Sequence, residues 1–392
     1  MNDRKSVWGI DVGNYALKAV HVVDADGPGE VVDFQVIPHA DQAGGTRGQR
    51  RELLLQSVQR LTKEADLRGS HVVIAVPGAS SYSRFMHLAP VEREELPDLV
   101  RFEATQQMPV PIDEVIWRWQ TFRDLDRPGM PDVDAGIFAL NRDDVGEMLL
   151  LFVEAGVTVD TMQAAPLALY NLLAGDHCLA AQEASLVLDL GAVETDAVIA
   201  HGRRIWTRTA PIGSACLTEA LALSLGLRLD QAEAMKRDLP AGEEGQKALE
   251  AMDRAFVKIA TTIKEALATY GSLHPMPHIP FAMAVGGGFL LAPLREFVQA
   301  EIGIPLFLAP EAPRLKTCAS AKIASAFHAH LPELAVACGL AIQGLGRAKV
   351  HTNFLPTGIE HKYGWSRPGD GKGVVEYLRK ILGEPPPPVG SL

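Results

Sequence analysis

The residues of this sequence best suited to chemistry are those of two Asp-x-Gly turns, each of which follows an apolar run. Asp11 and Gly13 end the first run, and Asp189 and Gly191 end the second, near the middle of the chain. Glycine lets the backbone turn tightly and bring its N–H groups close to a phosphate. An Asp at a strand end holds hydrated Mg²⁺ opposite such phosphates. A single such turn is common in loops, but two that face one another predict a site for a nucleoside triphosphate, with Mg²⁺ held through water by Asp11 and Asp189.

Two further features lie in the second half of the chain. Glu233 and Lys236 are three residues apart on a predicted helix, where they would hydrogen-bond a ribose and flank an adenine. On spacing alone, an exposed ion pair worth about 0.2–0.5 kcal/mol is the better interpretation. Gly286, Gly287 and Gly288 follow a buried strand, and three glycines in a row are costly in backbone entropy. We therefore expect a close approach to the backbone there, by a nucleotide base or phosphate, with a plain strand-to-helix turn as the alternative.

Strand-like runs and helical spacings surround both turns in the same order. In each half three strands lead to a helix, and the first strand ends in Asp-x-Gly. This repetition predicts a duplicated α/β domain with a cleft between its halves. We expect strands over 7–12, 17–23, 31–37 and 71–76 and a helix over 51–65 in the first half, then strands over 185–190, 196–200, 203–209 and 281–285 and helices over 217–225 and 230–237 in the second.

The stretch between the halves has its own strands and helices, which predicts an inserted α/β subdomain. Its expected elements are strands over 84–88, 115–122, 136–140 and 159–162 and helices over 94–107 and 143–155. The predicted domain boundaries are 1–79 with 162–184 for the first domain, 80–161 for the insertion, 185–349 for the second domain and 350–392 for a tail.

The tail differs from the rest of the chain in composition. Residues 374–382 predict a short helix with apolar residues along one face, and residues 385–388 are a stiff polyproline stretch. So short a helix is marginal alone in water, so its apolar face is expected to dock on something. We favour docking on a protein surface over docking on a membrane, because the helix has few basic residues and no Trp.

Composition narrows the class of protein. The chain has 392 residues, 47% of them hydrophobic and 22% charged, enough for a buried core in two or more domains. A formal net charge of −11 argues against a nucleic-acid or broad anionic-membrane surface. Four cysteines far apart in sequence indicate reduced thiols in a cytoplasmic protein. We expect no signal peptide and no apolar run of the length that crosses a membrane.

Several stretches together resemble a known family. They include Gly-Ile-Asp-Val-Gly at 9–13, Leu-Lys-Ala-Val at 17–20 and a Pro-x-Pro-x-Asp-Glu-Val ending at 109–115. Further carriers are at 99–104, 188–192, 207–213 and 232–237. Over most of residues 7–356 the chain resembles the PilM family of type IV pilus assembly proteins, which are related to FtsA. The resemblance implies an actin-like ATPase fold, made of duplicated ribonuclease H-like domains, with an FtsA/PilM-type inserted subdomain.

The resemblance also implies a role for individual residues in binding ATP and Mg²⁺. One departure is Asn14-Tyr15-Ala16, where the family usually carries small hydroxyl residues, so ATP binding is expected while the protein is at most a weak ATPase. The implied nucleotide-binding residues are Asp11, Gly13, Asn14, Tyr15 and Ala16 of the first phosphate loop, with Lys18 behind it; Asp189, Gly191 and Ala192 of the second; Glu233 and Lys236 of the adenosine-side helix; and Gly286, Gly287 and Gly288 of the adenosine motif.

The implied function is that of a cytoplasmic scaffold for type IV pilus, or type II secretion-like, assembly at the inner face of the membrane. Its implied partner is the tail of a PilN-like inner-membrane protein, with an Asn-Leu-Leu-Pro-like motif. Because residues 109–111 fix an extended backbone, we expect this tail to bind in the groove between the inserted subdomain and the body, near residues 101–115. Self-association is a further expectation. This chain carries Asn353-Phe354-Leu355-Pro356 itself, either as a fused or vestigial PilN start or as a simple turn. The alternatives are a sugar or small-metabolite kinase of the same fold and an FtsA-like membrane-associated filament adaptor.

Overall fold

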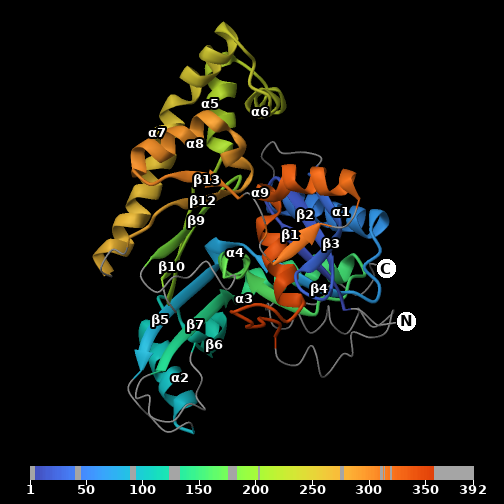
Figure 1. The fold of residues 1–392 in the computed structure, drawn as a ribbon, viewed down its shortest axis with the longest axis vertical. Helices are drawn as coiled ribbons and strands as arrows, with labels where there is room; N and C mark the ends of the chain where they lie inside the picture. The colour runs from blue at the N-terminus through green and yellow to red at the C-terminus, as the bar shows by residue number, and fades with distance from the viewer. Residues whose placement is uncertain are drawn as a thin grey trace.

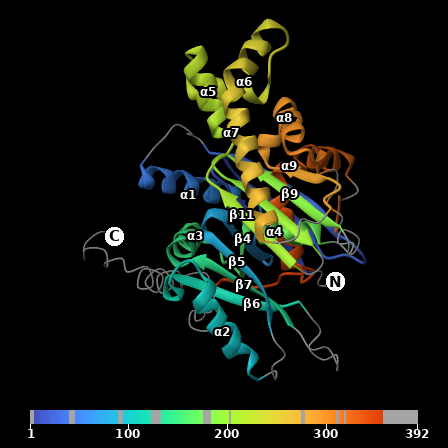
Figure 2. The ribbon, with the colours of Figure 1, turned by 90° about the vertical axis from the view of Figure 1, so that its left-hand side faces the viewer.

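The computed structural model of the protein shows two halves, each built on its own sheet, and a smaller inserted subdomain (Figure 1). A cleft lies between the halves. In both views the inserted helix α2 (Leu96–Gln107) lies at the opposite end of the molecule from α5 (Ala215–Leu225) and α6 (Leu229–Arg237) (Figures 1 and 2). The structure describes residues 5–39, 46–88, 94–122, 133–174, 183–201, 204–273, 278–309, 312, 314–317 and 320–356.

The first half is built on a six-stranded sheet that opens as the expected meander. β1 pairs antiparallel with β2, which pairs antiparallel with β3, and β4 and β8 extend the sheet parallel to β1. Helix α1 (Arg47–Glu64) begins where Thr46 accepts a hydrogen bond from the backbone N–H of Gln49, a capping box. The strands predicted here and the helix are confirmed. In sheet order the strands are β14 (Leu315–Thr317), β3 (Gly29–Pro38), β2 (Ala16–Val23), β1 (Ser6–Val12), β4 (His71–Val76) and β8 (Thr161–Ala164).

The second half repeats this opening on a five-stranded sheet with its own apolar core. β9, β10 and β11 form an antiparallel meander, and β12 and β13 run parallel to β9. The predicted strands and helices of this half are confirmed. The sheet order is β11 (Arg204–Ala210), β10 (Thr195–His201), β9 (Ala184–Leu190), β12 (Ala282–Val285) and β13 (Leu306–Leu308), and α7 (Glu243–Leu273) and α8 (Ala292–Ile302) pack in the same core as α5 and α6.

The inserted subdomain is smaller than predicted. It consists of α2 on a three-stranded sheet of order β5 (Ser81–Leu88), β7 (Val133–Asn141) and β6 (Val115–Thr121), and it has a separate core. Helix α3 (Arg142–Glu154) was assigned to the insertion from sequence, but its apolar face packs into the core of the first half, and β8 is an edge strand of the first sheet. The insertion therefore ends near residue 141, because the apolar face of α3 is covered by α1 and β4.

The second predicted boundary also needs correction. Residues 315–349 were assigned to the second domain, yet β14 pairs with β3, and α9 (Ala321–Gly344) packs against β1, β2 and β4. Helix α9 lies beside α4 (Ala165–Leu173), and both contribute to an apolar cluster that contains residues of both large sheets. The close approach of these helices depends on Gly339, where a Cβ would lie 1.9 Å from the carbonyl oxygen of Ala168.

Helix α9 is long and apolar enough to cross a membrane by composition, the one such helix among the described residues. Most of its apolar window is buried inside the protein, as in a core helix of a soluble domain. Beyond α9 the described chain continues to Pro356, with Phe354 and Leu355 buried. The predicted tail helix over 374–382 and the polyproline stretch lie outside the described residues.

Candidate functional site

A cleft of about 390 Å³ lies between the two halves, and all of the residues predicted to bind nucleotide line it. It is bordered by the turns after β1 and β9, by α6, by the glycine run after β12 and by α9. The fold thus brings together side chains from segments far apart in sequence. The predicted residues on its surface are Asp11, Gly13, Asn14, Tyr15, Ala16, Lys18, Asp189, Gly191, Ala192, Glu233, Lys236, Gly286, Gly287 and Gly288.

The first turn is held by a short hairpin and by an ion pair. The backbone N–H of Gly13 donates to the carbonyl oxygen of Ala16 at 3.1 Å. Lys18 Nζ lies 2.9 Å from Asp11 Oδ2 across the strand pair. Burial lowers the pKa of Lys18, but the charges of Asp11 and Asp189 outweigh it and the net shift is upward. Lys18 is therefore a firmly held cation between the two Asp-x-Gly turns.

A histidine that sequence reasoning missed supports this turn. His39 Nε2 donates to the carbonyl oxygen of Gly13 at 2.9 Å, and its Nδ1 lies 2.7 Å from the hydroxyl of Ser57. The backbone N–H of His39 also donates to the carbonyl oxygen of Tyr15 at 3.0 Å. Burial lowers the pKa of His39, so the ring is neutral at pH 7. The sequence shows only a histidine directly after the third strand, and nothing in that pattern predicts a supporting role.

The second turn carries a cluster of carboxylates, two of which were not predicted. Burial raises the pKa of Asp189 to about 7, an effect that Lys18 reduces and Asp11 increases. Burial also raises the pKa values of Glu194 and Asp196. Glu194 accepts from the backbone N–H groups of Gly78 and Ala79, at 3.3 Å each, and so joins the second turn to the first half.

This cluster fits a divalent cation held through water. Asp189 and Glu194, whose pKa values burial raises, lie near the ammonium group of Lys18, and added positive charge there would favour their ionised forms. Among the residues that the structure describes, no group of three His, Cys, Asp or Glu side chains is arranged to hold a metal directly. Mg²⁺ commonly keeps several of its own waters and uses one or two carboxylates, so a site of this kind does not need three protein ligands.

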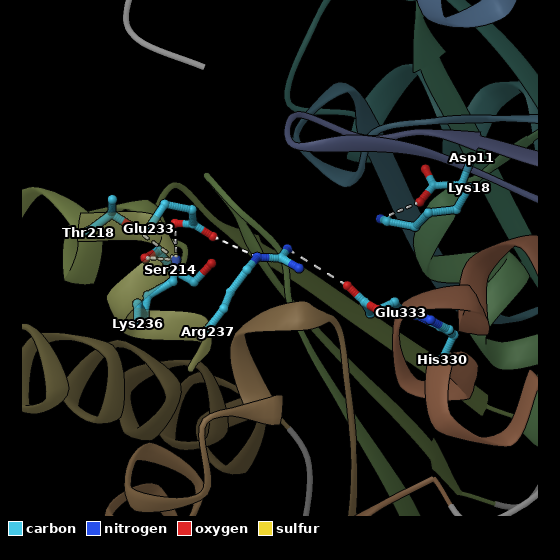
Figure 3. Close-up of polar contacts among 9 residues, drawn as sticks. All are labelled: Asp11, Lys18, Ser214, Thr218, Glu233, Lys236, Arg237, His330 and Glu333. Carbon is cyan, nitrogen blue, oxygen red and sulfur yellow. Dashed lines mark hydrogen bonds and ion pairs between the residues drawn. The ribbon is translucent and has the colours of Figure 1, made fainter. Parts of the chain in front are cut away.

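The pair Glu233 and Lys236 is buried, so its interpretation as an exposed ion pair is wrong. Their side chains are 12% and 9% exposed, with Lys236 Nζ 2.6 Å from Glu233 Oε2. Thr218 donates to the same carboxylate oxygen at 2.6 Å and accepts from Lys236 at 2.8 Å (Figure 3). Helix α5, which carries Thr218, covers the pair. Burial lowers the pKa of Lys236 despite the neighbouring carboxylate.

The glycine run packs against the second turn. At Gly286, whose φ is +86°, a Cβ would lie 2.3 Å from Asp189 Oδ1 and 2.4 Å from the carbonyl oxygen of Leu190. At Gly288 a Cβ would lie 2.5 Å from the side chain of Leu190. The close approach expected at this run is therefore made by the protein's own strand end, while Gly287 lines the cleft beside Glu333.

One arginine spans the cleft, and no pattern in the sequence predicted this role. Arg237, at the end of α6, pairs with Glu233 at 3.0 Å and reaches Glu333 of α9 at 3.9 Å (Figure 3). Its guanidinium lies 4.2 Å from the centre of the Tyr15 ring. Glu333 in turn pairs with His330 at 2.9 Å. The tyrosine that departs from the family pattern thus forms a contact between the two halves.

Two duplicated meanders around a cleft, with a small subdomain inserted in the first, define an actin-like fold. A family model described as type IV pilus assembly protein PilM matches residues 9–345. The chain therefore belongs to the PilM family, which confirms the resemblance.

Solved structures agree with this fold. The chain is similar to one from a PilM-PilN type IV pilus biogenesis complex, at 24% identity over 86% of this chain and 98% of that chain, with a TM-score of 0.73. Two more distant matches are ethanolamine utilization protein EutJ from Carboxydothermus hydrogenoformans (16% identity, 86% and 89% covered, TM-score 0.49) and a MamK double helical filament (12% identity, 86% and 98% covered, TM-score 0.47). TM-scores below 0.5 support no further conclusion. The family match favours neither the kinase nor the FtsA-like alternative.

Proposed function

We propose that the protein is a nucleotide-binding cytoplasmic scaffold of type IV pilus assembly, which binds the cytoplasmic tail of a PilN-like inner-membrane protein. Membership of the PilM family supports the pilus role over a type II secretion-like one. The similar structure from a PilM-PilN complex supports the partner. Through this partner the protein would be held at the inner face of the membrane. Self-association stays a prediction.

The single observation that carries nucleotide binding is the convergence of all the predicted residues on one cleft. In this proposal the backbones of the two Asp-x-Gly turns face the phosphates of ATP. Asp11 and Asp189 hold Mg²⁺ through water, and Mg²⁺ supplies charge neutralisation for the phosphates. Glu233 and Lys236, which line the cleft, would contact the ribose and the adenine. Bound ATP would favour one angle between the halves, and so one shape of the partner site.

The proposed role requires binding rather than turnover. The first turn offers Asn14, Tyr15 and Ala16 where small hydroxyl residues would contact the phosphates, and the ring of Tyr15 is engaged by Arg237. We therefore expect ATPase activity to be weak at most.

Calorimetry of the full chain with ATP and Mg²⁺ tests the proposal. The Asp189→Ala variant should bind ATP at least tenfold more weakly in the presence of Mg²⁺, about 1.4 kcal/mol, and the difference should shrink when EDTA replaces Mg²⁺. Asp253→Ala, at an exposed position on α7, is the matched control and should bind normally. Undetectable ATP affinity of the unmutated protein would remove the proposal of a nucleotide site.

A further inference from the structure

Residues 350–356, called here the docked segment, form neither a helix nor a strand although most of their side chains are buried. The segment follows α9 and lies between β6 of the inserted subdomain and β8 and α4 of the first half (in the red part of the chain in Figure 1). A buried irregular segment must find partners for its backbone polar groups. Here these partners are mainly side chains of the body.

Amide side chains hold the first part of its backbone. Asn171 of α4 accepts from the backbone N–H of Val350 at 2.9 Å and donates to its carbonyl oxygen at 2.8 Å. Gln120 of β6 accepts from the backbone N–H of His351 at 3.0 Å. Gln163 and Gln343 donate to the carbonyl oxygen of Thr352, at 3.1 Å and 2.9 Å. None of these bonds to the main chain depends on a particular side chain in the segment.

An arginine holds the second part. Arg118 of β6 donates through Nε to the carbonyl oxygen of Asn353 and through Nη2 to that of Leu355, both at 2.8 Å. The backbone N–H of Phe354 donates to the carbonyl oxygen of Met162 at 3.0 Å, which adds the segment to the edge of β8. This combination of main-chain pairing at a sheet edge with pockets for side chains is how proteins recognise extended peptides.

Side chains are recognised at three positions. Asn353 Oδ1 accepts from the backbone N–H of Met162 at 3.1 Å, and its Nδ2 donates to the carbonyl oxygen of Asp160 at 3.0 Å. Phe354 is 0% exposed and Leu355 is 3% exposed. The site therefore fits an extended segment with an asparagine followed by two large apolar residues.

The site also requires an occupant of this kind. Asn171 and Gln163 are fully buried, and Gln343 is nearly so. Without the segment, these amides would lose hydrogen-bond partners in the protein interior, which is costly. Because an empty site would leave these amides unpaired, the docked segment should leave only when another peptide takes its place.

We propose that this is a peptide-recognition site, and that the docked segment occupies it as an intramolecular ligand which the extended tail of a partner protein must displace. The inference rests on the proposed function, since it identifies how partner binding is regulated. Residues 346–349 link the segment to α9, and Gly346 and Lys349 in this link are exposed. A tethered ligand acts at an effective concentration in the millimolar range for a short link, so the intact chain should bind free peptides poorly.

The test is a full chain with a protease site inserted between Lys349 and Val350, which is cleaved without removing the docked segment. The probe is a fluorescent synthetic peptide with the sequence of residues 349–357, followed by fluorescence anisotropy. We expect the cleaved chain to exchange its segment and bind the probe at least tenfold more tightly than the uncleaved chain. Asn353→Ala in the uncleaved chain should also raise probe affinity, because it weakens only the intramolecular ligand.

Two arginine variants of the cleaved chain locate the site. Arg118→Ala should weaken probe binding at least tenfold, whereas Arg84→Ala, at an exposed position on β5 of the same subdomain, should leave it unchanged. Equal probe binding by cleaved and uncleaved chains overturns the inference. So does a cleaved chain with unchanged thermal unfolding that takes up no probe, or a dimer formed by exchange of segments between copies. Failure of a PilN-like peptide while the probe binds would instead count against the proposed function.

Discussion

The hairpins that begin the two halves of the molecule share one geometry and differ in charge. In the first, Asp11 lies opposite Lys18, and Gly13 N–H donates to the carbonyl oxygen of Ala16 at 3.1 Å. In the second, Asp189 lies opposite Asp196, and Gly191 N–H donates to the carbonyl oxygen of Glu194 at 3.0 Å. The backbone repeats, but a carboxyl group stands in the second hairpin where the first has an ammonium group.

This difference shows that the two turns depend on one another. The first turn carries its own counter-charge, while the second gathers three carboxyl groups whose pKa values are all raised by burial. Lys18 lies close enough to Asp189 for each to shift the pKa of the other. A repeated backbone thus supplies two turns at the cleft, and their unequal charges gather the carboxyl groups beside the second turn.

Removing the shared cation should have the largest effect. Lys18→Met retains the length of the side chain but leaves Asp11 without its partner, so repulsion between carboxylates and ATP phosphates is no longer offset. We expect the affinity for ATP and Mg²⁺ to fall at least a hundredfold, about 2.7 kcal/mol. Calorimetry of the variant measures it.

The matched control is Lys247→Met on α7. The ammonium group of Lys247 pairs with Glu243 at the surface, and the Lys247 side chain is 61% exposed. It should leave the affinity unchanged. If Lys18→Met bound ATP as tightly as the unmutated protein, the two turns would not share Lys18 and the comparison of the hairpins would lose its main consequence.

Asp196 stands in the second hairpin at the position that Lys18 has in the first. Neutralising Asp196 should stabilise the protein when no ligand is bound. Asp196 is 4% exposed, and burial raises its pKa well above 3.8. The unfolded chain ionises this group more readily than the folded one. Ionisation of Asp196 therefore costs the folded protein no stability below the pKa of the unfolded chain, and the cost grows as pH rises toward the pKa in the folded protein. At pH 8, without metal or nucleotide, Asp196→Asn should raise the free energy of unfolding by about 1–3 kcal/mol.

The pH dependence distinguishes this cause from a general packing effect. The gain from Asp196→Asn, measured by denaturant unfolding, should shrink as the pH is lowered and vanish near pH 4, where the unfolded carboxyl group is protonated too. Asp253→Asn, at an exposed position, should change stability little at either pH. A gain that is constant with pH would show that Asp196 is not held with a raised pKa.

Much of the fold and of the site could be predicted because the signals are local. Apolar runs that end in Asp-x-Gly mark both hairpins within a dozen residues, and the three glycines from Gly286 mark a close approach. What approaches them was not local: Leu190 and Asp189 lie against this run because β12 pairs with β9. The sequence predicted the contact but not the partner.

Other features depend on packing between distant segments. The helix spacing of Glu233 and Lys236 does not reveal that α5 covers them, so their burial was missed. Strand β14 has three residues, too few for a periodic signal, and it joins the first sheet only through its pairing with β3. Arg118 could not be related to the docked segment, since its hydrogen bonds to Asn353 and Leu355 span most of the chain.

The smallest expected effect concerns the contact that joins the hairpin of the first half to α6 of the second. Arg237 is 44% exposed, reaches Glu333 only at 3.9 Å, and lies over the Tyr15 ring. Such contacts at exposed sites contribute about 0.5–1 kcal/mol, so their loss should be modest. In Arg237→Gln, a fluorescent ATP analogue should dissociate about twofold to fivefold faster in stopped-flow measurements, because the halves are held together less firmly around it. Arg254→Gln on α7, also exposed, is the control and should dissociate at the normal rate. Dissociation that is unchanged or slower in Arg237→Gln would mean that this contact does not hold the cleft closed.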